Sequence, residues 1–188
     1  MNRSIEKILV NIIKHELNLP DTYGTTSNGD EIPTVIIYSQ NIKLFNTKKL
    51  QVTVRCLNID TWSNRSEFVT NTDGTYCEVQ DLNQAYMIQV DCYSRNNEAR
   101  DRFWEITAAL KSNYAVQQMD LYNFKIATIT KTNNISGVDG GSDVNRYSIT
   151  FKVLTHEQKT TPIDYYDKFQ VTADNESGQF ADIKNYTT

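Results

Sequence analysis

The stretch YMIQVDCYSRNNEARDRFWEITAALKS, residues 86–112, decides the fold because its hydrophobic period changes partway along. Its first half alternates as a strand does, with Tyr86, Ile88, Val90 and Cys92 on one side. Its second half has the spacing of a helix, with the apolar stripe Ala99, Phe103, Ile106 and Leu110. We therefore predict a strand that leads directly into a helix capped by Asn96 or Asn97.

The polar centre of this stretch has the acids, thiol and arginines of a possible active site. Asp91 and Glu98 could form a pair of catalytic carboxylates. However, Asp91 shares its strand side with Gln89, and Glu98 falls in the first helical turn, where an acid interacts favourably with the helix dipole. Arg102 lies four residues after Glu98 and is its expected partner. These spacings favour structural roles for both acids.

The regions before this stretch predict one helix and several strands. An apolar helical face follows a candidate cap at Ser4 and consists of Ile5, Ile8, Leu9, Ile12, Ile13 and Leu17. Charged residues interrupt this segment, so it suits neither a signal peptide nor a membrane span, and we expect a soluble cytoplasmic protein. Strand-like runs occupy residues 34–45 and 48–62, and Asp73-Gly74 is a hairpin signal.

The regions after it predict a long hairpin and an arm. Residues 121–133 and 144–157 alternate like strands, and residues 134–143 form a glycine-rich tip between them. The tip is a flexible turn, a turn ordered by a neighbouring subunit, or an ion site at Asp139 and Asp143. Residues 159–188 are polar and lack a steady period, as an extended arm would.

These elements define the expected architecture. The class is α+β, with a mostly antiparallel sheet flanked by an N-terminal helix and a central helix, a long β-hairpin and an extended C-terminal arm. The expected domains are residues 1–158 and the arm, residues 159–188. The total of 188 residues suits one core. In the arm, the aromatic residues Tyr165, Tyr166 and Phe169 are candidate interface anchors.

The composition of the chain disfavours several classes of function. A net charge of −4 without a basic stripe disfavours stable nucleic-acid binding. Cys56, Cys77 and Cys92 have no C-x-x-C spacing and suit buried thiols. The only histidines, His15 and His156, lack a second histidine at ligand spacing. We therefore expect no metal, no cofactor and no catalytic site.

The order of segments resembles that of bacteriophage neck and tail terminator proteins. The resemblance rests on YMIQVDCYSRN turning directly into NEARDRFWEITAALKS, on the N-terminal helix and IPTVIIYSQN before it, and on LYNFKIATIT paired with NRYSITFKVLTHEQ after it. It covers residues 5–156 and is carried by order and pattern. The insertion holding residues 62–81 and the arm after Thr160 match it least.

This resemblance implies a structural, non-enzymatic virion protein. Such a protein forms a ring of about six copies that caps the tail tube and joins it to the neck or connector of the head, beside a sheath where the tail is contractile. It would be assembled in the host cytoplasm, and DNA would pass through the ring without specific binding. The surfaces assigned to subunit or axial contacts are Arg100, Asp101, Glu105, Lys111, Val138, Asp139, Asp143, Tyr165, Tyr166 and Phe169.

Two alternatives remain open at this point. The chain could be another head-to-tail connector or completion ring, or a tail-tube subunit, which is the same class of role at another level of the virion. It could also be a small α+β enzyme or ligand-binding domain, in which case changing His156 or Asp91 would remove an activity.

Overall fold

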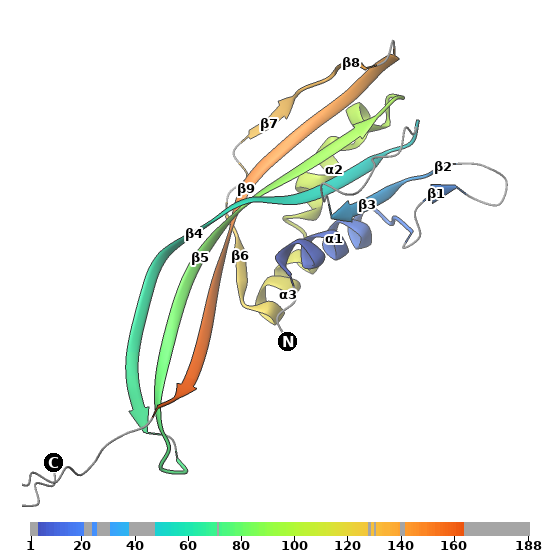
Figure 1. Cartoon of the computed structure of the whole chain (residues 1–188). Coiled ribbons are helices and arrows are strands. Elements are labelled where there is room, and N and C mark those ends of the chain that lie inside the picture. The colour runs from blue at the N-terminus through green and yellow to red at the C-terminus, as the bar shows by residue number, and fades with distance from the viewer. Residues whose placement is uncertain are drawn as a thin grey trace, which may run out of the picture. The chain divides into compact units, whose positions relative to one another are not determined.

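The computed structural model describes residues 4–20, 24–25, 31–37, 48–70, 72–127, 129, 131–139 and 142–163 (Figure 1). Its helices are α1 (Ile5–Glu16), α2 (Glu98–Ala109) and α3 (Asn113–Tyr122). Its strands are β1 (Gly24–Thr25), β2 (Glu31–Ile32), β3 (Thr34–Ile37), β4 (Gln51–Thr70), β5 (Tyr76–Ser94), β6 (Phe124–Ile126), β7 (Lys131–Asn134), β8 (Gly137–Asp139) and β9 (Ser142–Pro162). The predicted α+β class is confirmed.

The main sheet has seven strands in the order β3-β4-β5-β9-β6, and β7 and β8 also pair with β9. β3 runs parallel to β4, and β6, β7 and β8 run antiparallel to β9, so the sheet is mixed but mostly antiparallel. The predicted Asp73-Gly74 turn connects β4 to β5. Gly74 has a φ of +84°, which glycine adopts without strain, and Asp73 accepts a hydrogen bond from the Thr75 amide at 2.9 Å.

The chain divides into two compact units, and β4, β5 and β9 contribute to both. The first contains residues 1–64 and 82–157, and the second contains residues 65–81 and 158–188. β9 continues to Pro162, so the first residues of the predicted arm are a strand. The Ile163 amide donates to the Tyr76 carbonyl at 3.1 Å within the second unit. The rest of the arm lies outside the described residues.

In the first unit all three helices lie on one side of the sheet (Figure 1). The largest fully buried side chains are Leu9, Ile12, Ile13, Val35, Leu50, Val52, Val54, Ile88, Val90, Ile106, Leu110 and Ile149. Most come from α1, α2 and the strands, whereas Leu50 directly precedes β4 and Leu110 directly follows α2. All of them belong to one hydrophobic cluster. Of the apolar positions predicted for α1 and for the strand beginning at Tyr86, Ile5 and Tyr86 are partly buried and pack against this cluster, and the others belong to it.

The predicted strand over residues 121–133 is partly wrong, because its first two residues are the end of α3. The Ser112 hydroxyl caps α3 by accepting from the Ala115 amide at 3.0 Å. Asn123, at φ +52°, ends the helix in the left-handed conformation. The remainder of the run forms β6 and β7, and the hairpin with β9 is antiparallel as predicted.

Candidate functional surface

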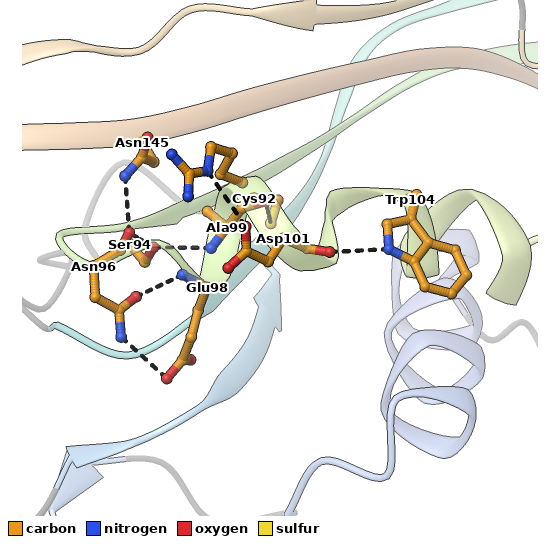
Figure 2. Close-up of polar contacts among 9 residues, drawn as sticks. Cys92, Ser94, Asn96, Glu98, Ala99, Asp101, Trp104 and Asn145 are labelled. Atoms are coloured by element: carbon orange, nitrogen blue, oxygen red, sulfur yellow. Dashed lines mark hydrogen bonds and ion pairs between the residues drawn. The ribbon is translucent and has the colours of Figure 1, made fainter.

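The strand-to-helix corner is held by side chains that bind backbone groups (Figure 2). The Ser94 hydroxyl accepts from the Ala99 amide at 2.9 Å and donates to the Asn96 carbonyl at 2.7 Å. The Asn96 side chain accepts from the Glu98 amide at 2.9 Å, whereas Asn97 makes no side-chain capping bond. Of the two predicted caps, Asn96 therefore has the capping contact, and Ser94 adds a second one.

Glu98 connects α2 to the start of β4. Its carboxylate accepts from the Leu50 amide at 2.8 Å and lies 3.4 Å from the Lys49 ammonium. Burial alone would raise the pKa of Glu98, but the Leu50 amide, Asn96 and Lys49 lower it below its usual range. The predicted pairing with Arg102 is wrong, because Arg102 pairs with Glu105 at 2.8 Å.

Asp91 is buried and joins β5 to β9. It accepts from the Gln89 amide group at 2.7 Å and from the Arg146 guanidinium at 2.8 Å. Burial would raise the pKa of Asp91, yet the hydrogen bonds from Gln89, Arg146 and Ser148 outweigh it and hold the pKa below its usual range. Asp91 therefore stays ionised and engaged at neutral pH, as a structural role requires.

The neighbouring thiol is equally enclosed. Cys92 is fully buried, and its burial raises the pKa to about 12. Its sulfur lies 3.9 Å from the Ala99 carbonyl oxygen (Figure 2). Cys92 therefore stays a protonated core residue at neutral pH, and the corner arranges its polar groups to fix α2 against the sheet.

The outward side of α2 carries an exposed surface made by Arg100, Asp101 and Trp104, which we call the α2 surface. The Arg100 guanidinium lies 3.3 Å from the Asp101 carboxylate. The Trp104 indole N–H donates to the Asp101 carbonyl at 2.9 Å, while 58% of the residue stays exposed (Figure 2). A tryptophan whose polar atom is satisfied and whose ring is open suits an interface anchor.

The four residues that were predicted to share one exposed face of this helix do not all lie on one surface. Arg100 and Asp101 lie together on the α2 surface, as expected. Glu105 is half-buried and engaged by Arg102, so it does not share that surface, and Lys111 is exposed in the turn before α3. Trp104 was not predicted as a site residue. The sequence signal that indicates its exposure is its position outside the apolar helical stripe, which consists of Ala99, Phe103, Ile106 and Leu110.

The predicted hairpin tip is shorter than the glycine-rich sequence indicated. β8 pairs with β9 up to Asp139 opposite Ser142, so residues 137–139 of the predicted tip are a strand. Val138 is 74% exposed on β8. The side chains of Asp139 and Asp143 lie outside the described residues, as do Tyr165, Tyr166 and Phe169.

A second group of open apolar side chains lies along β4. In the first unit, Leu57, Ile59 and Trp62 are all exposed, and in the second unit Phe68 is exposed. Val52 and Val54 belong to the core that faces the helices. Because side chains alternate along a strand, Leu57 and Ile59 occupy positions on the opposite face of the sheet.

The histidines have structural neighbours. The His15 ring stacks on Tyr114 of α3 with centroids 3.8 Å apart, and His156 Nδ1 lies 3.1 Å from the Asn83 side-chain oxygen. Within the described residues, no group of His, Cys, Asp and Glu could hold a metal ion. In the same part of the chain, no helix is long and apolar enough to cross a membrane.

Comparison with protein-family models and with curated proteins finds no match to this chain.

The capping role of Ser94 gives a stability prediction. Ser94→Ala removes the acceptor for the Ala99 amide, and we expect it to lower the free energy of unfolding by about 1 kcal/mol. Urea denaturation followed by circular dichroism measures this change. The control is Asn97→Ala, which removes no capping bond and should change the free energy by less than about 0.5 kcal/mol. Equal effects of the two variants would contradict the assignment.

Proposed function

We propose that this protein is a structural virion protein whose copies form a ring of about six at the end of a phage tail tube, where the ring joins the tube to the neck or connector. The order of helix, strands, helix and hairpin supports the proposal, because it is the order of the terminator proteins that the sequence resembles. The proposal assigns the protein no reaction.

The observation that carries this proposal is the presence of two separate surfaces in the first unit that each expose large apolar side chains. One is the α2 surface with Trp104, and the other is Leu57 and Ile59 on β4. α2 lies on the same side of the sheet as the other helices (Figure 1). Leu57 and Ile59 take the alternate positions on the other side, because side chains alternate along a strand. A cyclic ring needs two different surfaces per subunit, because each copy contacts its two neighbours in different ways.

The contacts around Trp104 suit such an interface. The indole N–H is already satisfied by Asp101, so burying the ring against a neighbour would leave no polar atom without a partner. Arg100 and Asp101 at its side form a polar rim, which is the usual surrounding of an interface anchor. The net charge of −4 is compatible with a conduit that DNA crosses without stable binding.

Negative-stain imaging of the purified full-length chain tests the proposal. We expect single annular particles, because a terminator caps a tube and does not extend it. Long tubes formed by the protein alone would favour a tail-tube subunit. A compact monomer that loses a measurable activity on Asp91→Asn or His156→Ala would contradict the structural role.

A further inference from the structure

Among the described residues, the outer edge of β4 has no paired strand beyond the short pairing with β3. β3 covers only Gln51–Val54 of β4. From Arg55 to Thr70, the structure places β5 on one side of β4 and, among the residues it describes, no strand on the other side. Unpaired amides and carbonyls along such an edge are a template for another extended chain.

The opposite edge of the second unit is less suited to pairing. There β9 carries Lys159 and Pro162, and proline has no amide to donate. Lysine and proline are the residues that proteins use to protect exposed edges. Residues 65–70 of β4 contain no proline and include Phe68, Val69 and Thr70, which favour strands. The edge available for pairing is therefore that of β4.

The charges on this edge are self-complementary about Ser66. Arg65 and Glu67 flank it, both side chains are exposed, and within one copy the Arg65 guanidinium lies 3.1 Å from the Glu67 carboxylate. If two copies of β4 pair antiparallel with Ser66 opposite Ser66, Arg65 of each copy faces Glu67 of the other, and the contact forms twice. Opposite charges at directly facing positions stabilise an antiparallel pair, and this register places no like charges there.

The second unit also carries an exposed aromatic residue beside this edge. Phe68 is 60% exposed and shares the strand side of Ser66. It stacks on Tyr76 of β5, with ring centroids 6.0 Å apart, which supports one side of its ring. Aromatic side chains on paired strands add to the stability of the pair.

We infer that two copies of this chain pair through the outer edges of β4, antiparallel and with Ser66 on a two-fold axis. The contact joins the two sheets into a continuous one and is centred on residues 65–67 in the second unit of each copy. This inference goes beyond the proposed ring and does not depend on it, because it concerns a two-fold contact and not the head-to-tail contacts of a cyclic assembly.

A disulfide test locates the axis. Paired residues in antiparallel strands have Cα atoms about 4.5 to 5.5 Å apart, which suits a disulfide. Ser66→Cys in the full chain should therefore form a cross-linked dimer under mild oxidation. The matched control is Ser63→Cys on the same strand. In the proposed register, the two introduced thiols would lie several residues apart along the paired strands. Cross-linking of Ser66→Cys alone supports the contact. Equal cross-linking of both variants, or of neither, overturns it.

Charge reversal tests the register by a second route. Arg65→Glu and Glu67→Arg each place like charges opposite one another twice, and each should weaken dimerisation at least about tenfold in sedimentation equilibrium. The double variant R65E/E67R restores opposite pairs and should return the dissociation constant to within about threefold of the original. A chain that stays at its monomer mass of 21.6 kDa, or a double variant as weak as the single ones, contradicts the pairing.

Discussion

Replacing Asp91 by alanine is expected to lower the free energy of unfolding by about 3 kcal/mol at neutral pH, because it leaves Arg146 and Gln89 without their shared acceptor. Asp91 is buried between β5 and β9, so water cannot replace the lost contacts fully. Chemical denaturation measures the change. Asp60→Ala, at an exposed position of β4, is the control and should have an effect below about 0.5 kcal/mol.

The effect of Asp91 should also depend on pH. Its folded-state pKa lies below the usual value for aspartate, so its contribution is complete above the unfolded-state pKa and is lost as the pH falls through the folded-state pKa. The difference in stability between the original chain and Asp91→Asn should therefore narrow on acidification from neutral pH. A difference that stays constant or widens would contradict the role assigned to the Asp91 carboxylate.

Ile106→Ala is expected to destabilise the fold by about 2 to 5 kcal/mol, because Ile106 is fully buried where α2 contacts the core. Trp104→Ala, two residues earlier on the same helix, should cost less than about 1 kcal/mol, since it removes one hydrogen bond and an exposed ring. Urea denaturation compares the two variants under the same conditions.

For assembly the order of the two effects should be reversed, with Trp104→Ala having the larger effect. Trp104→Ala should reduce the assembled fraction in sedimentation velocity while the subunit stays folded, because the α2 surface loses its anchor. A destabilisation by Trp104→Ala as large as that by Ile106→Ala would show that Trp104 belongs to the fold and not to an interface.

The elements that local pattern determines could be predicted from the sequence. The alternation before Cys92 and the helical stripe after Asn96 gave the strand and α2, since a buried face repeats with the period of its element. Asp73-Gly74 predicted the β4–β5 turn, because only a few residues adopt the backbone that such a turn requires. The overall α+β class followed from these elements.

The features that could not be predicted depend on contacts that the local spacing of residues does not reveal. Glu98 binds the Leu50 amide, which lies far earlier in the chain, so spacing on the helix suggested Arg102 instead. The role of Ser94 depends on how the chain turns after β5. Residues 113–122 contain β-branched and aromatic residues that weaken a helical prediction, although Ser112 was a recognisable cap. Trp104 was not predicted because local spacing does not distinguish a tryptophan that stays exposed from one that packs against a neighbouring element.

The mass of the purified full-length protein tests the ring most directly. Size-exclusion chromatography with light scattering, over a range of concentrations, should give a species of about six copies of the 21.6 kDa chain, or a multiple of that mass where the β4 pairing also joins rings. Trp104→Glu should shift this species to smaller forms while circular dichroism shows a folded chain. A protein that remains monomeric at every concentration, or a Trp104→Glu variant that assembles as the original does, would contradict the proposed ring and its α2 surface.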